Sequence, residues 1–331
     1  MVYQPDKLTY FALALDPIHV GTGGYRLGRV DMTIVREPGT NLPKIPGTSL
    51  SGAARTYAAM QENRFRWQEG DKTYVCAGQG QEDKDKNIPG HCGKYDCPIC
   101  VTFGFSKGSG VSFQGLAQFF DARLLFFPVH SLAGPVWVTC PEALKDVGVA
   151  VDEPDNNFVV VTTDVQQSGK LNLGWLMLGV KPNDPLILNL PQVPQEILEH
   201  AVLVSDKMFG HIVNDNLEVR TSVSIDPQTG AAAEGALFTY EALPRATVLY
   251  FEVVVSHPKY YRIARTVEKN GKKETESVIP LSDNNGHPEG NIDKVKSTVN
   301  NGLKLFASLG VGGMNTRGMG RLRVFSAGGA Q

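Results

Sequence analysis

The stretch FDARLLFFPVHSLAGPVWVTCP, residues 120–141, contains the run closest to a continuous apolar segment, Leu124 to Val138. Pro128, His130 and Pro135 interrupt this run, so it falls short of the roughly 18 apolar residues that a membrane-spanning helix needs. Proline also interrupts a helix interior, whereas strands of a buried sheet are often short and apolar. We therefore expect residues 120–141 to supply core strands of a protein without a membrane span.

Working outward from this block, apolar runs predict further core strands and a few helices. Leu8–Leu15 and Thr247–Val255 are apolar enough to be strands buried on both faces. Apolar residues recur at helical spacing over Leu50–Ala58, and further helices are expected at Pro191–His200 and from about Asp293 to Leu309. Strands and helices do not alternate strictly along the chain, which favours an α+β fold over a doubly wound sheet.

Two kinds of excursion interrupt this core. Leu217–Ile225 alternates apolar and polar residues, a turn follows at Asp226–Gly230, and Ala236–Tyr240 can run back, which predicts a projecting β-hairpin. In contrast, 61–90 and 265–291 are polar or charged and lack periodicity. We expect these two stretches to be loop insertions at the surface.

The charge of the chain is close to zero overall but unevenly distributed. Among 331 residues there are 32 Lys and Arg against 34 Asp and Glu, a formal charge of −2. Val20–Arg66 has seven bases and three acids, or +4, whereas Pro141–His200 has three bases and nine acids, or −6. A nearly neutral protein with this asymmetry can present a positive face to phosphate, although any chain shows some fluctuation of charge.

Four of the five cysteines lie within 25 residues, together with one histidine. Cys97 and Cys100 have the spacing with which two cysteines reach one tetrahedral metal, and Cys92 adds a third ligand. The fourth ligand is His91 or Cys76, and a structural zinc ion would fix a loop that is otherwise too polar to fold. A redox pair and ordinary reduced thiols are the alternatives. The odd cysteine count and the lack of a secretion signal argue for a reducing cytoplasm.

The segment LGVGGMNTRGMGRLRV, residues 309–324, combines five glycines with three arginines. Glycine lets backbone amides approach a phosphate closely, but simple turns explain the same pattern. Asp31 and His19 lie near another glycine-rich turn, HVGTGG at residues 19–24. A lone aspartate or histidine is more often a cap, a surface charge or a core residue, so the residues alone assign these two no role.

Several motifs together resemble one family from end to end. They are HVGTG at 19–23, VDMTIVRE at 30–37, IPGTSLSGAAR at 45–55, the block at 120–141 and the terminal glycine-rich loop. These motifs resemble the RAMP superfamily of CRISPR proteins and, more narrowly, the repeated backbone subunit of the type III-B (Cmr) effector complex. The block at 120–141 is the most specific of them.

The resemblance implies a modified ferredoxin-like (RRM-type) core with inserted loops, a projecting hairpin called the thumb and a zinc-binding insertion. A single RAMP domain would span 1–331, with a cysteine-rich insertion at 61–110, the thumb at 212–246 and a surface insertion at 262–292. Copies of the chain would form a helical filament along the guide RNA (crRNA), together with other type III effector subunits and no membrane. The thumb of each copy would enter the guide–target duplex at regular intervals.

The resemblance also implies an activity, the cleavage of complementary single-stranded target RNA by an endonuclease that depends on Mg²⁺ or Mn²⁺. Asp31 is the first catalytic candidate, because a carboxylate can receive the proton of the attacking 2′-hydroxyl or hold a hydrated metal ion. His19, Glu234 and Glu241 are candidate helpers. The candidate RNA-binding residues are Gly21, Gly23, Arg36, Gly47, Ser49, Ser51, Arg55, Gly310, Gly312, Gly313, Arg317, Gly318 and Gly320.

Two other functions fit the same motifs. In the first, the chain forms the filament on crRNA without cutting, as a non-catalytic subunit of a type III complex. In the second, it processes the repeat transcript without a metal, with His19 as the acid–base group.

Overall fold

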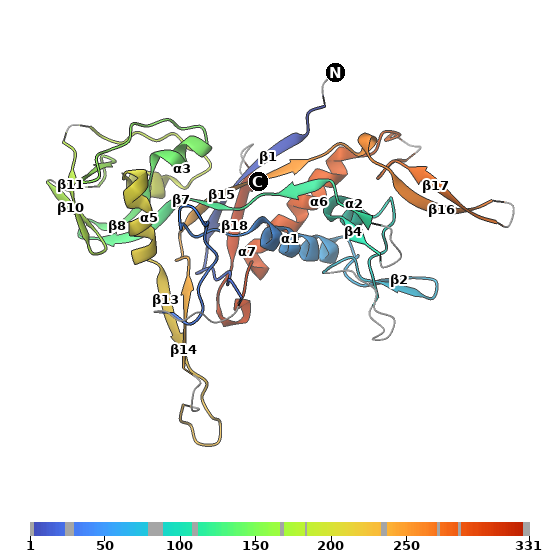
Figure 1. Ribbon diagram of the computed structural model, residues 1–331, viewed down its shortest axis with the longest axis horizontal. Helices are drawn as coiled ribbons and strands as arrows, with labels where there is room; N and C mark the ends of the chain where they lie inside the picture. Colours follow the sequence, from blue (N-terminus) through green and yellow to red (C-terminus); the bar gives the residue numbers. More distant parts are fainter. Residues whose placement is uncertain are drawn as a thin grey trace. The chain divides into compact units, whose positions relative to one another are not determined.

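The structure is a computed structural model that describes residues 3–23, 30–78, 89–107, 112–165, 169–182, 184–232, 237–269, 272–283 and 286–326 (Figure 1). The chain divides into two compact units, each assembled from three segments. Unit 1 comprises Met1–Thr9, Gly47–Phe120 and Glu252–Phe306, and unit 2 comprises Tyr10–Pro46, Asp121–Phe251 and Ala307–Gln331. Neighbouring stretches of sequence therefore often belong to different units.

Unit 2 is built on a mixed β-sheet with the strand order β10-β11-β9-β12-β8-β7-β15-β1-β18. The pairs β9–β11 and β8–β12 are parallel, whereas β7–β8 and β1–β18 are antiparallel. The strands are β1 (Asp6–Ala14), β7 (Arg123–Ser131), β8 (Gly134–Thr139), β9 (Phe158–Val161), β10 (Lys170–Leu173), β11 (Leu176–Val180), β12 (Ala201–Leu203), β15 (Val248–Val255) and β18 (Leu322–Ser326). The first part of β1 and the last part of β15 belong to unit 1.

The apolar block at 120–141 forms the middle of this sheet, as predicted. Leu124–Phe127 of β7 is buried, with at most 4% of each residue exposed. The chain then turns back into β8, where Gly134 has a φ of +96° that an L side chain rarely adopts. The predicted strand at 8–15 is confirmed as β1, and the one at 247–255 as β15.

Short helices in the described part of unit 2 include α3 (Pro141–Asp146), α4 (Gln195–Glu199) and α5 (Asp206–Asp215). The hydroxyl of Ser205 caps α5 by accepting the amide of Met208 at 3.4 Å. The helix predicted at 191–200 is confirmed as α4. Each of these helices is only one to three turns long, so their stability depends on packing against the sheet.

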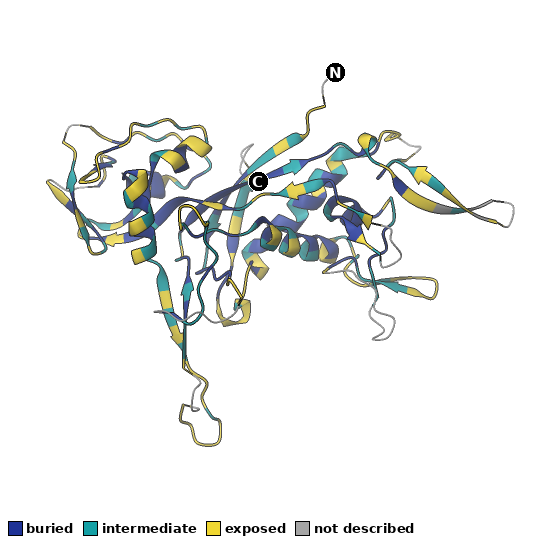
Figure 2. Cartoon of the chain, viewed as in Figure 1, coloured by how far each residue is buried: buried dark blue, intermediate teal, exposed yellow. Residues whose placement is uncertain are grey.

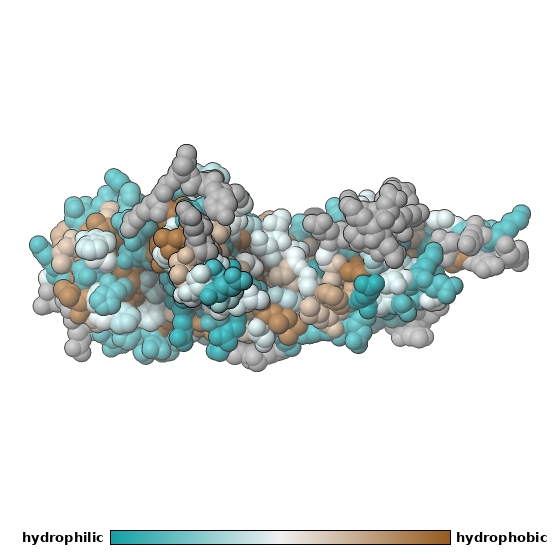
Figure 3. Space-filling model, turned by 90° about the horizontal axis from the view of Figure 1, so that it is seen from below, coloured by the Kyte–Doolittle hydropathy of each residue, from teal (hydrophilic) through white to brown (hydrophobic). Residues whose placement is uncertain are grey.

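The predicted hairpin is confirmed as β13 (Glu218–Ser222) and β14 (Phe238–Ala242), which pair antiparallel and project from the rest of unit 2 (Figure 1). Burial falls toward its tip (Figure 2). Its apolar side is the exposed one, because Val219 and Ile225 are 50% and 56% exposed while Glu218 and Arg220 are half-buried. Apolar and polar residues consequently lie side by side on the face from which the hairpin projects (Figure 3).

Unit 1 combines helices with short strand pairs. Its helices are α1 (Gly47–Gln61), α2 (Pro98–Phe103), α6 (Ile292–Lys304) and the start of α7 (Phe306–Leu309), and a 3₁₀ turn covers Pro258–Tyr260. Helices α1 and α6 pack so closely that a Cβ at Gly302 would lie 2.3 Å from the carbonyl oxygen of Ala54. Strand β6 (Ala117–Phe119) pairs with the last residues of β15, Val253–Val255.

The two stretches expected to be loops contain regular structure, which corrects the prediction. Residues 61–90 include the short hairpin β2 (Trp67–Glu69) and β3 (Lys72–Tyr74), and another small pair, β4 (Phe105–Ser106) with β5 (Ser112–Phe113), follows. Strands β16 (Ile263–Lys269) and β17 (Lys272–Val278) pair antiparallel as a hairpin. In its register Arg265 lies opposite Glu276, and pairs of opposite charge stabilise a strand pair that has no apolar alternation to reveal it.

The lengths of the helices in the described residues show whether any of them could span a membrane. The longest of them, α1, has 15 residues. No helix in the described ranges is long and apolar enough to cross a membrane.

Candidate functional site

Asp31 lies at the base of the hairpin in unit 2, where its carboxylate is held by one residue of β14. Its Oδ2 accepts hydrogen bonds from the backbone amide of Thr239 at 2.7 Å and from the hydroxyl of Thr239 at 2.9 Å. The same hydroxyl accepts the amide of Asp31 at 3.1 Å. These bonds, the backbone one first, lower the pKa of Asp31 below its ordinary value, so the half-buried carboxylate is ionised at neutral pH.

Backbone pairing fixes the segment that carries Asp31. Met32 forms a parallel β-bridge with Tyr240. The amide of Met32 donates to the carbonyl oxygen of Thr239 at 3.1 Å, and its carbonyl oxygen accepts the amide of Glu241 at 3.0 Å. Gly21 bridges Ile34 on the next stretch of chain. The carboxylate therefore sits on a strand-like segment that extends the hairpin, and its position depends on residues about 200 positions away.

His19 is buried next to the same strand, with 5% of its surface exposed. Its Nδ1 lies 2.6 Å from the carbonyl oxygen of Glu241, which can only accept, so Nδ1 carries the proton and Nε2 keeps a lone pair in the neutral ring. Its ring contacts the ring of Tyr240 edge-on, at 6.0 Å between centroids. The structure thus brings His19 and Asp31 to the same part of β14.

Glu241, a candidate helper, forms an internal ion pair. Its Oε2 lies 2.9 Å from a guanidinium nitrogen of Arg36 and accepts the amide of Ile34 at 3.3 Å. The Nε of Arg36 also donates to the side chain of Asn214 at 3.0 Å. Glu241 and Arg36 therefore hold the segment of Asp31 against β14. The fourth catalytic candidate, Glu234, lies outside the described residues.

The C-terminal glycine loop packs on His19. A Cβ at Gly312, where φ is +88°, would lie 2.5 Å from the carbonyl oxygen of His19, which also accepts the amide of Gly313 at 2.8 Å. Gly310 and Gly320 approach each other equally closely, at 2.8 Å from a Cβ of the former to the carbonyl carbon of the latter.

The loop also contains the exposed 3₁₀ turn Asn315–Arg317, followed by Gly318 at a φ of +76°. The guanidinium of Arg317 lies over the ring of Phe238 at 5.6 Å, which connects the loop to β14. At the first turn, Gly21 and Gly23 are exposed, and a Cβ at Gly21 would lie 3.0 Å from Nε2 of His19. One glycine of each turn, Gly21 and Gly312, thus packs closely on His19.

The other RNA-binding candidates belong to unit 1 and lie on α1. Gly47 begins the helix, and a Cβ there would lie 2.3 Å from the carbonyl oxygen of Phe119. Ser49 and Ser51 are partly exposed on the first turns. Arg55 is different, because only 8% of it is exposed and its guanidinium points into the interior of unit 1.

Beside Arg55, the cysteine-rich segment gathers four thiols. The sulfur atoms of Cys76, Cys92, Cys97 and Cys100 all lie within 4.8 Å of one another, and all four residues are buried. The separations Cys92–Cys100 and Cys76–Cys97 are 3.6 and 3.9 Å, close to the roughly 3.8 Å between sulfurs that share a tetrahedral zinc with bonds of about 2.3 Å. This four-cysteine cluster can hold a metal ion.

The structure supplies Cys76, and not His91, as the fourth member of the cluster. His91 points its Nε2 to the carbonyl oxygen of Gly78 at 3.1 Å, and burial lowers its pKa to about 4, so the ring is neutral. A bond from the indole of Trp67 to the sulfur of Cys76, at 3.4 Å, is typical of a thiolate ligand. Cys140, the fifth cysteine, is buried in unit 2, as expected for a core residue.

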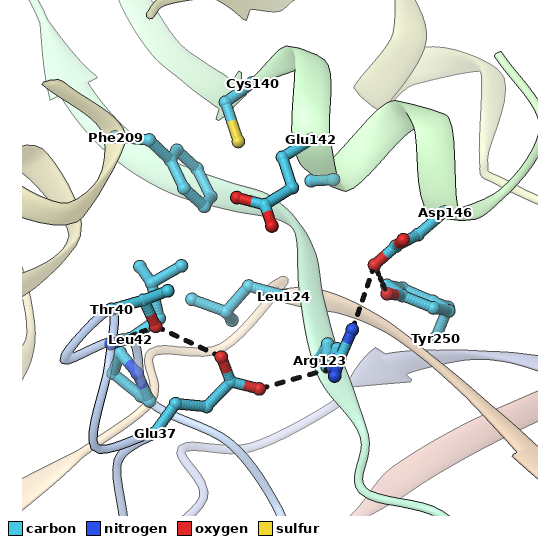
Figure 4. A pocket seen from close by; sticks show the side chains of 12 residues that line it. Glu37, Thr40, Leu42, Arg123, Leu124, Cys140, Glu142, Asp146, Phe209 and Tyr250 are labelled. Carbon is cyan, nitrogen blue, oxygen red and sulfur yellow. Dashed lines mark hydrogen bonds and ion pairs between the residues drawn. The ribbon is translucent and has the colours of Figure 1, made fainter. Parts of the chain in front are cut away.

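A pocket elsewhere in unit 2 is lined by charged residues that form ion pairs with one another (Figure 4). Arg123 bridges Glu37 at 3.3 Å and Asp146 at 3.2 Å, and the hydroxyl of Tyr250 donates to Asp146. No predicted site residue is among the described residues that line it. We assign this pocket no role in the chemistry.

Two important residues were missed by sequence reasoning. Thr239, which holds Asp31, looks like any threonine of a strand, and only its pairing with residue 31 shows its role. Trp67, which donates to Cys76, lies in a stretch that the composition marked as a loop. Neither residue type has a local pattern that would reveal these contacts.

The fold and the two sites can now be compared with known proteins. The chain belongs to the RAMP superfamily, whose family model matches residues 12–323. A curated relative, the CRISPR system Cmr endoribonuclease Cmr4 of Pyrococcus furiosus, is 25% identical over 264 residues, which cover 73% of this chain and 79% of the relative.

Solved structures show that the fold is shared along almost the whole chain. The type III-B Cmr-β complex bound to cognate target RNA contains a chain with a TM-score of 0.60 and 14% identity, and the match covers 99% of both chains. Oligomeric Cmr4 from Pyrococcus furiosus matches with a TM-score of 0.57 and 19% identity, over 97% of this chain and 99% of that one.

Proposed function

We propose that this protein is the crRNA-binding backbone subunit of a type III-B CRISPR effector complex and cleaves complementary target RNA at regular intervals. Its membership of the RAMP superfamily supports this, as does its similarity to a Cmr endoribonuclease over 73% of the chain. The fold shared with a chain of a Cmr complex bound to target RNA supports it further. Its partners are then crRNA, target RNA, further copies of itself and the other subunits of the complex.

The observation that carries the activity is the ionised carboxylate of Asp31 at the base of the projecting hairpin. The hairpin exposes apolar side chains, which can insert between bases, and Asp31 is fixed next to the strand that would enter the duplex. A duplex interrupted at the hairpin would present its distorted backbone to this carboxylate. Distortion toward in-line geometry lowers the barrier to attack by the neighbouring 2′-hydroxyl.

In this reaction Asp31 receives or orients the proton of the 2′-hydroxyl. The residues also fit a catalytic Mg²⁺ or Mn²⁺, since such ions are often held by one or two carboxylates together with substrate phosphates. When bound, that ion would neutralise charge on the phosphate. His19, whose Nε2 keeps a lone pair, and Glu241, which positions the segment of Asp31, would assist.

For the RNA-binding surfaces we propose the exposed start of α1, with Ser49 and Ser51, and the turn with Arg317 and Gly318. Amides at a helix start and in glycine turns attract phosphate, and adjacent positive charge adds to this. Such contacts follow the shape of the backbone and need little net charge on each copy. We also retain the proposed RAMP architecture, a modified ferredoxin-like core with insertions at 61–110 and 262–292 and the thumb at 212–246.

In the cysteine cluster we propose a structural zinc ion bound by Cys76, Cys92, Cys97 and Cys100. The donor set and the sulfur separations fit a closed tetrahedral site. All four positions are taken by protein, so this ion would stabilise unit 1 and take no part in cleavage.

The test of the activity is Asp31→Ala in the assembled complex with guide and target RNA. We expect cleavage to fall by about 10²–10⁴-fold, the usual contribution of a general acid or base. Affinity for target should stay within a few fold, because most binding comes from base pairing and other contacts. Single-turnover cleavage and equilibrium binding measure the two quantities separately.

Asp152→Ala is the matched control, since it removes an exposed aspartate of the same unit and should leave cleavage unchanged. Full cleavage by Asp31→Ala would overturn the assignment of Asp31. A wild-type complex that binds target but never cuts it would show a non-catalytic filament subunit. Cleavage of repeat RNA by the isolated chain in chelator would instead indicate a processing enzyme.

A further inference from the structure

The buried guanidinium of Arg55 reaches from α1 into the cysteine-rich part of unit 1. Its Nε donates to the carbonyl oxygen of Cys76 at 2.7 Å, and one terminal nitrogen donates to the carbonyl oxygen of Gly104 at 2.7 Å. Cys76 is a member of the metal cluster, and Gly104 directly follows α2, which carries Cys100. Arg55 therefore contacts both ends of the segment that builds the cluster.

This guanidinium has no carboxylate partner among the described residues. Only 8% of Arg55 is exposed, and no Asp or Glu in the described ranges forms an ion pair with it. The charge cannot be lost, since arginine stays protonated in proteins. Burial of an unpaired cation is strongly unfavourable, so a compensating negative charge is expected nearby.

The loaded cysteine cluster would carry that negative charge. A divalent ion bound by four thiolates has a net charge of two negative units, and all four cysteines are at most 2% exposed. A buried dianion without a counter-charge would be as unfavourable as the lone arginine. In the metal-loaded protein these two buried charges of opposite sign would compensate each other.

A second observation points the same way. The other terminal nitrogen of Arg55 is a buried donor without a hydrogen-bond partner among the described residues. Another such atom, the hydroxyl of Thr102, belongs to a residue two positions from Cys100. Unsatisfied buried donors are rare and need an explanation, and thiolate sulfur is a better acceptor than a neutral thiol.

We propose that Arg55 is the internal counter-ion of a metal-loaded four-cysteine centre and positions that centre on α1. This rests on the metal ion proposed above. It also gives Arg55 a role different from guide binding, since two of its nitrogens are used by Cys76 and Gly104 and the side chain points inward. Metal binding and the placement of α1, with its partly exposed Ser49 and Ser51, are then coupled through one residue.

The test separates the charge of Arg55 from its hydrogen bonds. Arg55→Gln keeps donors but removes the charge, and Arg55→Lys keeps the charge but loses the planar fork. The full-length chain is loaded with Zn²⁺ or Co²⁺ alone, and metal release to a chelator is followed, with the Co²⁺ spectrum reporting tetrahedral sulfur ligation. We expect release from Arg55→Gln to be about 10–100-fold faster than from wild type, and release from Arg55→Lys to be much closer to wild type.

Thermal unfolding with and without metal supplies a readout that a merely structural role would not change. A counter-ion makes the stabilisation by metal smaller in Arg55→Gln, whereas a purely structural arginine would lower both melting temperatures equally. Arg66→Gln, which removes an exposed arginine of the same unit, is the matched control and should behave as wild type.

The outcomes distinguish this inference from the metal proposal. Wild type without stoichiometric metal would overturn both. A loaded wild type together with Arg55→Gln that holds metal as tightly as Arg55→Lys would overturn only the counter-ion. If Arg55→Gln does not fold, Arg55→Lys decides, because a folded lysine variant that binds no metal would contradict the role of the charge.

Discussion

The cysteine cluster of unit 1 and the Asp31 site of unit 2 are constructed in opposite ways. The cluster is closed, with four buried sulfurs from one stretch of 25 residues. Asp31 is half-buried, and its carboxylate is held by Thr239, 208 positions further along the chain. One site excludes solvent around a compact ligand set, and the other leaves a single carboxylate accessible beside a projecting hairpin.

The functions proposed for the two sites would explain this difference. A structural metal site stabilises the fold best when every coordination position is filled by protein. A site that cuts a polymer has to admit that polymer, so its walls cannot close and its geometry depends on strand pairing elsewhere. Damage to the cluster should therefore appear as lost stability, and damage around Asp31 as lost cleavage.

The largest effect on stability is expected from Cys97→Ser. The substitution removes one of the four proposed metal ligands, just before the start of α2, where the residue is 1% exposed. Loss of a metal site belongs to the few mechanisms that cost more than about 4 kcal/mol. Metal analysis should show loss of the bound ion, and calorimetry should show a large fall in the melting temperature.

Cys140→Ser is the control for that substitution, because it changes an equally buried cysteine of unit 2. It should lower stability modestly and leave the metal content unchanged. Equal metal content in both variants would show that the cluster does not bind the ion.

A smaller effect is expected from Gly312→Ala in the glycine loop. Its φ of +88° is unfavourable for alanine, and the new Cβ would lie 2.5 Å from the carbonyl oxygen of His19. We expect a loss of about 1–3 kcal/mol, together with slower cleavage because His19 has to move. Thermal unfolding and single-turnover cleavage measure the two effects.

The neighbouring Gly313→Ala separates this clash from a general need for glycine. Its Cβ would lie 3.7 Å from the ring of His19, an ordinary contact, and its φ is not in the left-handed region. We expect its stability to change by less than about 0.5 kcal/mol. Equal losses in both variants would contradict the close approach to His19.

Much of the fold was accessible from sequence because its signals are local. The apolar run at 120–141 and the period-two alternation at 217–225 are both local patterns typical of strands, and they are confirmed as β7–β8 and β13. The hairpin β16–β17 was missed because it is polar on both sides, so pairing and not burial holds it together. The division into two units of three segments each has no local signal at all.

The sites differ in the same way. Cysteine spacing alone indicated Cys92, Cys97 and Cys100, and the structure decided between Cys76 and His91 for the fourth position. The local sequence around Asp31 did not indicate a catalytic role, and Asp31 became a candidate only through the resemblance to a family. The internal partners of Arg36 and Arg55 are far away in sequence, and no composition or spacing reports such contacts.

The smallest effect is expected from Thr239→Val, which tests how Asp31 is held. The variant removes the hydroxyl that donates to Oδ2 but keeps the backbone amide bond, which is the larger cause of the lowered pKa of Asp31. The pKa should therefore rise only part of the way to its ordinary value. Since Asp31 remains ionised at neutral pH, cleavage there should fall only modestly, through looser positioning.

The lowered pKa of Asp31 also predicts the direction in which the pH dependence changes in Thr239→Val. A lowered pKa means that the contribution of the Asp31–Thr239 bonds to folding is present at neutral pH and is lost as pH falls through the folded-state pKa. In Thr239→Val this loss, and the acid limb of the cleavage profile, should begin at higher pH than in wild type. Thr239→Ser keeps a hydroxyl and should restore the wild-type limb. Carboxyl NMR titration of Asp31 measures the shift directly, and an unchanged pKa in Thr239→Val would show that the hydroxyl does not tune this carboxylate.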